Sequence, residues 1–519
     1  MHSQRISKFE IAIIFLLLLL VVAPILAVFL DLINPLIRQD ISKDSFLTET
    51  RIYKLFAKSL YLSFAVLISC TIIAFPIAWL FSKYSFPFKG IFATLTVVPL
   101  FIPPYISAIS WMYAFDSQGW LGFPDSFNFI SGFGGNLLVF SFWLFPLMFL
   151  FFHNALLIGK PYYETVSLYR RFWPGIRFKM TLMVKYGVIP GMILTFVLVF
   201  VNFSVPGVLQ LNVYPTEIFA QFGAFYDQEQ AALLSLPNLI IAIFLAVFIS
   251  KHFHRQSRFG LLNHLPGFQT VSGFKLIAIY TFFIAFLLAV IGIPILSLVL
   301  RTESFSTFIQ AIADTYMQWI NSLLFALAGT LVICLMAFLL VWHVRHKPGL
   351  QILSMIILLL PMFVSGGLYA IGLIQVWNQS FLGGFVYGSS LMVILSYFRF
   401  MPIAFFLILI GISKLPKRFE EIAYLSTGNK LAVISKIVLP QIKNSVFGAL
   451  SITFIFCFAE LDTVVLTYPP GMETIPVRIF ALLHYGTHQT VAALCLWQVI
   501  IIIAIVLPLS GLINQKLLK

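Results

Sequence analysis

Apolar residues occupy most of the chain in long runs that short polar segments separate. A helix that crosses a bilayer needs about 20 mostly apolar residues, and twelve stretches meet this requirement. They are residues 10–31, 59–82, 90–115, 136–158, 187–210, 231–250, 276–300, 318–343, 352–377, 389–413, 444–466 and 488–513. Short alternating strands of the barrel type are not seen. The pattern predicts an all-α integral membrane protein of about 12 transmembrane helices.

The composition agrees with this fold class. Hydrophobic residues make up 61% of the chain and charged residues 10%, whereas soluble proteins average about 25% charged residues. The four cysteines lie inside apolar runs and form no CxxC pair, so we expect neither a disulfide framework nor a zinc site. The first apolar run is too long for a signal peptide, and we expect it to be retained as a helix.

The net charge of +14 is distributed unevenly along the chain. With the N-terminus inside, the segments predicted to be cytoplasmic hold 24 of the 32 lysines and arginines. This excess follows the positive-inside rule. The basic charge is therefore an orientation signal, no nucleic-acid partner is expected, and both termini are predicted to be cytoplasmic.

The two halves of the sequence resemble each other at an offset of about 260 residues. The matching positions are Ser59 with Ser322, Trp79 with Trp342, 99–109 with 361–371, and 195–204 with 453–462. Six helices in each half give both halves the same orientation. We therefore predict two fused six-helix units, residues 1–255 and 256–519, related by an axis along the membrane normal, with a pathway between them.

The chain carries no energy source of its own. No segment between predicted spans much exceeds about 30 residues, and no GxxxxGK[ST] phosphate loop occurs. We expect the chain to bind no cofactor and to catalyse no covalent reaction. If ATP drives transport, a separate subunit must hydrolyse it.

Residues 414–443 form one of the few long polar interruptions. Two short helices are predicted at 418–425 and 430–439, with a turn between them. Pro440 disfavours helix at the preceding residue, so we expect the chain to bend there as it enters the membrane. An amphipathic hairpin on the lipid surface is one interpretation, although an acidic pair, Glu420 and Glu421, is unusual beside an anionic leaflet.

The same loop resembles the EAA loop of permease subunits in bacterial binding-protein-dependent ABC importers. In that family the loop makes two short helices that fit a groove in the ATPase. The resemblance implies ATPase-coupling roles for Glu421, Ala423, Thr427, Gly428, Leu439 and Pro440. Thr427 stands where the family has its glycine, and Gly428 follows it. A degenerate copy of the loop occupies 159–186, where Glu164 is the matching residue.

A second resemblance covers the ends of the fifth and eleventh predicted spans. Residues 202–219 and 460–479 resemble the corresponding segments of the ferric-iron class of permeases, whose relatives handle thiamine and phosphonates. The resemblance implies an importer for ferric iron, or alternatively for thiamine or a phosphonate, in the bacterial inner membrane. Its expected partners are a soluble binding protein at the external face, two ATP-binding cassette subunits that use ATP, and membrane lipid.

Polar residues at these two span ends are candidates for the pathway. Glu460 and Asp462 are carboxylates at the edge of a central span, where charge is costly enough to suggest a role. Their hard oxygen atoms would suit ferric iron, and Asn202 and Ser204 are their neutral counterparts. Alternatively, the carboxylates cap a helix end or pair with Arg478. No metal ligand is firmly assigned.

Other polar residues within apolar runs have simpler expected roles. Arg399 and His153 are expected to make structural hydrogen bonds or to snorkel. The pairs at 103–104 and 366–367, two prolines and two glycines, are expected to permit kinks or close packing. An ion-coupled secondary transporter is the rival interpretation, but it predicts more ionisable groups in mid-span than this chain offers.

Overall fold

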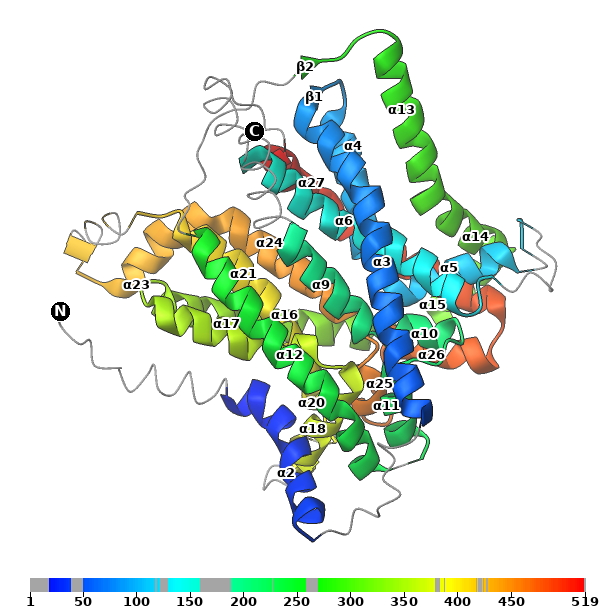
Figure 1. Cartoon of the computed structure of the whole chain (residues 1–519), viewed down its shortest axis with the longest axis vertical. Helices are drawn as coiled ribbons and strands as arrows, with labels where there is room; N and C mark the ends of the chain where they lie inside the picture. The colour runs from blue at the N-terminus through cyan, green and yellow to red at the C-terminus, as the bar shows by residue number, and fades with distance from the viewer. Residues whose placement is uncertain are drawn as a thin grey trace. The chain divides into compact units, whose positions relative to one another are not determined.

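A computed structural model gives the fold of most of the chain (Figure 1). It describes residues 18–38, 50–116, 119–121, 129–158, 188–225, 227–257, 269–378, 383–386, 388–416, 418, 422, 424–425 and 428–517. The chain forms two compact units whose segments alternate along the sequence. Unit 1 comprises Met1–Thr48, Ile218–Ser257 and Thr315–Arg478, and unit 2 comprises Glu49–Glu217, Arg258–Asp314 and Ile479–Lys519. The predicted division at 255 and 256 concerns repeated sequence, and it stays a prediction.

Unit 2 is built almost entirely from helices. They are α3 (Thr50–Lys83), α4 (Lys89–Val97), η3 (Val98–Phe101), α5 (Pro104–Phe115), α6 (Phe133–Ile158), α9 (Ile189–Phe200), α10 (Ser204–Val208), the start of α11 (Tyr214–Gly223), α13 (Phe274–Leu287), η5 (Leu288–Gly292), α14 (Ile293–Thr302), α15 (Phe305–Asp314), the end of α26 (Ile475–Tyr485) and α27 (His488–Leu517). Two short strands, β1 (Tyr84–Ser85) and β2 (Gln269–Thr270), pair in parallel.

Unit 1 is also helical. Its elements are η1 (Leu18–Val22), α2 (Ala23–Arg38), the end of α11, α12 (Gln228–Ser257), α16 (Tyr316–Val344), α17 (Pro348–Phe363), α18 (Gly366–Asn378), α19 (Gly383–Val386), α20 (Leu391–Ser396), η6 (Tyr397–Phe400), α21 (Met401–Ser413), α23 (Lys430–Val433), η7 (Ile434–Val438), α24 (Leu439–Phe458), α25 (Val464–Thr467) and the start of α26.

The predicted all-α membrane fold is confirmed. Within the described residues, 8 helices are long and apolar enough to cross a membrane, or up to 10 if each bent helix pair counts as one span. The predicted spans 187–210 and 444–466 extend too far, because their helices end at Phe200 and Phe458. In both places a buried polar residue follows within two positions, Asn202 or Glu460, and its side chain begins a new turn.

Two predicted spans are broken rather than continuous. Lys89–Phe101 and Pro104–Phe115 meet at 95°, and Pro348–Phe363 and Gly366–Asn378 meet at 104°. Ile102 is extended because the following proline disfavours helix at that position. Val364 is likewise extended ahead of the glycine pair. The kinks expected at 103–104 and 366–367 are therefore in the right places, but the two helices at each place meet at about a right angle.

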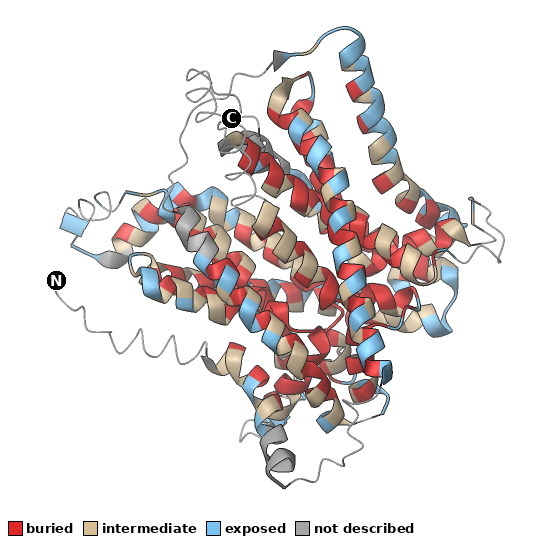
Figure 2. Ribbon diagram, viewed as in Figure 1, coloured by how far each residue is buried: buried red, intermediate tan, exposed pale blue. Residues whose placement is uncertain are grey.

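Burial separates packed helix faces from faces suited to lipid (Figure 2). Figure 2 shows α13 mostly in tan and pale blue, whereas α6 carries a dense set of buried residues. In a bilayer the exposed apolar side chains of such helices contact lipid rather than water. Many apolar side chains of each unit therefore lie outside its buried core.

Equivalent positions in the two halves make the same contacts. The Ser59 hydroxyl accepts a hydrogen bond from the Tyr214 N–H at 2.8 Å, and the Ser322 hydroxyl accepts one from the Ile475 N–H at 2.7 Å. Within single helical segments of each half, cation–π pairs join Lys83 to Trp79 and Arg345 to Trp342, and stacked rings join Phe196 to Phe200 and Phe454 to Phe458. Similar contacts thus occur in both halves, and the duplication itself stays a prediction.

Candidate functional site

A buried polar cluster in unit 1 contains one of the predicted pathway residues. Glu460 follows the last residue of α24 by two positions, and its carboxylate Oε1 accepts a hydrogen bond from the Thr463 N–H at 3.0 Å. This bond starts the short helix α25 in the manner of an N-cap. Glu460 therefore caps a helix end, as one of the two sequence-based alternatives expected.

Arg399 supplies the positive charge of this cluster. It lies in η6, inside the candidate span Leu391–Ser413. Its Nη1 donates to Glu460 Oε1 at 2.9 Å and to the Thr463 hydroxyl at 2.8 Å, and its Nη2 donates to the Val364 carbonyl at 3.4 Å. The side chains of Arg399 and Glu460 are only 6% and 9% exposed. We refer to Val364, Arg399, Glu460 and Thr463 as the Arg399 junction.

The break between α17 and α18 belongs to the same junction. Val364 is extended, so its carbonyl is free to accept the bond from Arg399. A Cβ built on Gly366 would lie 2.5 Å from the Asp462 Cβ and 2.7 Å from Arg399 Nη1. Only glycine fits at that distance, and Asp462 therefore lies against the start of α18. Its side chain is buried.

The partner of Arg399 was missed by sequence reasoning. Arg399 was expected to make structural hydrogen bonds, and the contacts above are of that kind. Arg478, the alternative partner for the carboxylates, instead lies 3.8 Å from Glu473. The only available signal was that Arg399 and Glu460 are opposite charges within apolar runs, and it does not specify which charges meet.

The counterpart in unit 2 carries no charge. Asn202 Oδ1 accepts hydrogen bonds from the Val205 N–H at 3.0 Å and from the Ser204 hydroxyl at 3.3 Å. Asn202 and Ser204 are both buried. The turn after α9 is therefore capped as the turn after α24 is, but by an amide. A symmetric set of carboxylates is absent at these two positions, as the sequence indicated.

The coupling loop 414–443 is described in part. Arg418, Ile422, Tyr424 and Leu425 are helical. Gly428 has a positive φ of 62°, and its N–H bonds to the Tyr424 carbonyl at 2.8 Å. This is the left-handed ending that glycine gives to many helices. The glycine one position later than in the family pattern thus makes the turn. The coupling candidates Glu421, Ala423, Thr427 and Glu164 lie outside the described residues.

The exit from this loop differs from the expectation. Leu439 is helical, with φ −55° and ψ −45°, so the predicted bend before Pro440 is wrong. A π-helical turn, η7, precedes the proline instead. Because proline lacks an N–H and its ring crowds the preceding turn, this wider turn accommodates it. Residues 430–458 consequently form one continuous helical segment that runs from the loop to the junction.

The first helix of the loop exposes apolar side chains. Ile422 is 65% exposed and Leu425 84% exposed. Both lie in a polar segment between candidate spans. Exposed apolar side chains flanked by polar ones are typical of surfaces that bind a partner.

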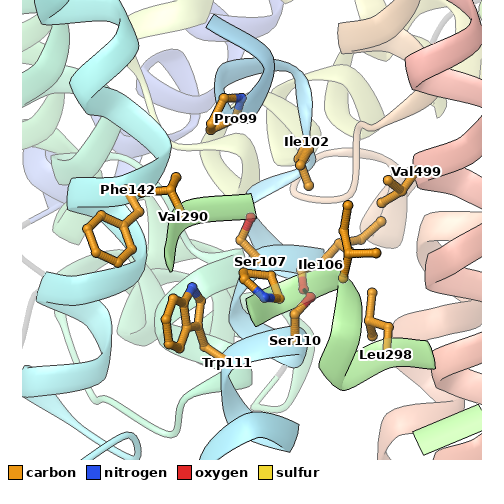
Figure 3. Close-up of a pocket in the computed structure, with 12 residues that line it drawn as sticks. Pro99, Ile102, Ile106, Ser107, Ser110, Trp111, Phe142, Val290, Leu298 and Val499 are labelled. Carbon is orange, nitrogen blue, oxygen red and sulfur yellow. Dashed lines mark hydrogen bonds between the residues drawn. The ribbon is translucent and has the colours of Figure 1, made fainter. Parts of the chain in front are cut away.

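Unit 2 contains a small cavity between α5 and α14, which residues of η3, α6, η5 and α27 also line (Figure 3). Its volume of about 20 Å³ has room for roughly one water molecule. Figure 3 shows the Ser107 and Ser110 side chains beside the apolar residues that line it. No lining residue is titratable. The cavity therefore offers no substrate site.

His153, also buried, packs against aromatic side chains. His153 stacks on Phe149, with ring centroids 5.7 Å apart, and meets Phe81 edge-on.

Among the described residues, no group of three or more His, Cys, Asp or Glu side chains could hold a metal ion. In the described parts of the chain, the Arg399 junction and the coupling loop are thus the two candidate functional features.

Comparison with known proteins agrees with the motifs. No family model matches the sequence. The chain is 23% identical to the Fe(3+)-transport system permease protein FbpB 2 of Haemophilus influenzae, over 85% of this chain and 86% of that protein. It is 23% identical to the putative ferric transport system permease protein FbpB 1 of the same organism, over 88% and 78%. It is 21% identical to the ferric transport system permease protein FbpB of Actinobacillus pleuropneumoniae, over 89% and 72%. The expected resemblance of this chain to the ferric-iron class of permeases is confirmed.

Proposed function

We propose that this chain is the membrane permease of an ABC importer for ferric iron. It forms the translocation pathway, receives substrate from a soluble binding protein at the external face, and catalyses no covalent reaction. The similarity to ferric transport permeases over most of the chain supports the substrate class. Thiamine and phosphonates find no such support among these relatives.

Separate ATP-binding cassette subunits supply the energy by docking at the cytoplasmic loops. One observation carries this part of the proposal: the helix that ends at Gly428 exposes Ile422 and Leu425 outside the candidate spans. Glu421, Ala423 and Thr427 share this loop. Glu164 is the proposed contact in the first-half loop.

The proposed architecture is a duplicated unit of six helices, twelve spans in all, in the bacterial inner membrane with both termini cytoplasmic. The repeated contacts of Ser59 and Ser322 support the duplication, as do the two breaks of 95° and 104° at matching places. Composition alone would not reproduce such specific contacts. The Lys and Arg bias supports the orientation.

We assign the pathway lining to the segments that follow α9 and α24. Asp462 offers a carboxylate there, and Asn202 and Ser204 offer neutral oxygens. Glu460 already accepts bonds from Arg399 and Thr463. Its proposed part is to hold the lining segment in place through these bonds.

Uptake of labelled ferric iron in a strain lacking the chain tests the substrate. Restoring the chain should restore iron uptake and leave thiamine uptake unaltered. Iron uptake that does not depend on the chain would refute the substrate assignment. If only thiamine uptake depends on it, the chain belongs to the thiamine branch of the class.

Co-purification with the ATPase subunit tests the docking. Glu421→Lys and Leu425→Asp should each abolish it, because one reverses a charge and the other places a charge on an apolar contact. Tyr485→Asp is the matched control, since Tyr485 is equally exposed but lies in an external loop of the proposed topology. Docking is refuted if the two loop variants retain the ATPase as well as the control does.

A further inference from the structure

We propose that Arg399 is a positioning residue of the transport cycle, which ties the break between α17 and α18 to the far end of the helix that leaves the coupling loop. This inference rests on the proposed function. It assigns to the buried ion pair a role in transmitting movement, in addition to its role in packing.

The first step is a continuous helical segment, which connects the loop to the Arg399 junction. Residues 430–458 are continuously helical. At a rise of about 1.5 Å per residue the segment is about 40 Å long. It packs against α16 and α21 of the same unit. A displacement of its loop end therefore reaches its other end, where Glu460 follows within two residues.

The second step is the ion pair at that end. Glu460 Oε1 binds Arg399 Nη1 at 2.9 Å and is fixed in direction by the Thr463 N–H. Because both side chains are nearly fully buried, separating them would leave two unpaired charges in an apolar interior. The two residues are thus expected to move together.

The third step is the broken span. Arg399 Nη2 binds the Val364 carbonyl, and Gly366 at the start of α18 lies close to Nη1. A guanidinium carries five donors in a planar fork, so it can hold a carboxylate, a hydroxyl and a carbonyl at once. A lysine offers a single point charge and could not span all three.

The Arg399–Glu460 ion pair is found in unit 1. Its counterpart, Asn202, makes the same cap through a neutral amide. The ion pair therefore lies in the same unit as the coupling loop 414–443. Of the two coupling loops, this one matches the EAA pattern better. Movement entering through this loop is the movement that Arg399 would transmit.

Reconstitution of the whole complex tests the proposal. The chain, its ATPase subunits and the binding protein are placed in vesicles, and iron uptake and ATP hydrolysis are measured on the same sample. The double variant Arg399→Met with Glu460→Leu removes both charges together. We expect iron taken up per ATP hydrolysed to fall severalfold, because the end of α24 and the broken span would no longer be held together.

Arg399→Lys is the second variant, and it keeps the charge should the double variant fail to assemble. We expect its uptake per ATP to fall as well, because the three-way contact is lost. The control is Arg51→Met, which removes an ion pair to Glu217 at 2.6 Å in unit 2 and should leave the ratio unaltered.

The outcomes separate the two levels of the inference. A wild-type complex that imports no iron refutes the proposed function and this role with it. A wild-type complex that imports iron, together with Arg399 variants that match its uptake per ATP, overturns the positioning role alone. A loss in the control equal to that in the Arg399 variants would also overturn it, since losing an ion pair elsewhere in the chain would then suffice.

Discussion

Arg399 and Glu460 lie 61 residues apart in the sequence, and their side chains meet at 2.9 Å in the interior of one unit. Each is the kind of residue that an apolar run should exclude. Together they neutralise each other, and they join the end of α24 to η6 and to the break after α17. This buried ion pair therefore lies where three elements of the unit are joined.

Removing one member of this pair should destabilise the chain strongly. We expect Arg399→Met alone to lower the free energy of unfolding by about 3–5 kcal/mol, because Glu460 would stay buried without its partner. The double variant with Glu460→Leu should lose clearly less. Thermal melting of the purified chain in detergent gives the comparison. Additive losses would show that the two side chains do not stabilise each other.

The neighbouring glycines 366 and 367 should respond differently to alanine. A Cβ at Gly366 would press on Asp462 Cβ and Arg399 Nη1, at 2.5 and 2.7 Å, whereas one at Gly367 meets only Leu466 at 3.9 Å. We expect Gly366→Ala to destabilise by about 1–3 kcal/mol, as overpacking does. Gly367→Ala is the matched control and should melt like the wild type. Equal melting temperatures for both variants would contradict the close contact.

Gly372 should tolerate no side chain, for a different reason. A Cβ there would overlap the backbone carbonyl of Pro24, where α2 crosses α18. Since backbone cannot move as a rotamer can, we expect Gly372→Ala to separate the two helices and to lower the melting temperature. Gly448→Ala meets nothing within 4 Å and should be neutral or stabilising, as alanine favours helix. Protease accessibility of α2 in the intact membrane offers an independent measurement.

The serines at equivalent positions should matter equally. Ser59→Ala and Ser322→Ala each remove the acceptor of a buried N–H, that of Tyr214 or Ile475. An unsatisfied buried donor costs about 1–3 kcal/mol. Both variants should therefore melt at lower temperature by similar amounts, and Ser306→Ala, at an exposed hydroxyl, should not. A loss confined to one of the two serines would argue against equivalent roles.

Gly428→Ala should affect coupling more than folding. A left-handed conformation costs a residue with a Cβ about 1–2 kcal/mol, and Gly428 has a φ of 62° in an exposed turn. Because this turn is exposed, we expect it to change conformation locally, which weakens co-purification of the ATPase subunit and leaves the melting temperature close to that of the wild type. Gly349→Ala, at an ordinary φ with open space around it, is the control. Full ATPase binding by Gly428→Ala would show that the turn geometry is not needed.

The class of fold and the places where the chain changes direction could be predicted from the amino-acid sequence. Apolar run length is sufficient for the helical membrane class, because lipid leaves backbone groups no other partners. The turn at Gly428 and the breaks near Pro103 and Gly366 were also readable, since glycine and proline act locally. The motifs of the coupling loop and of the span ends pointed to the ferric-iron class for the same reason: they are short and local.

The angle of each break and the identity of the distant residues that meet depend on how the helices pack in the folded chain. Hydropathy is the same for a straight span and for one bent by 104°, because both bury the same apolar residues. Hydropathy also does not specify which residues contact each other. The pairing of Arg399 with Glu460 and the contact of Gly372 with Pro24 could therefore not be predicted from it. Such contacts depend on the directions in which helices pack, and apolar helices in lipid have no hydrophobic force that sets those directions. Close packing and buried polar bonds set them instead, and these exist only in the folded chain.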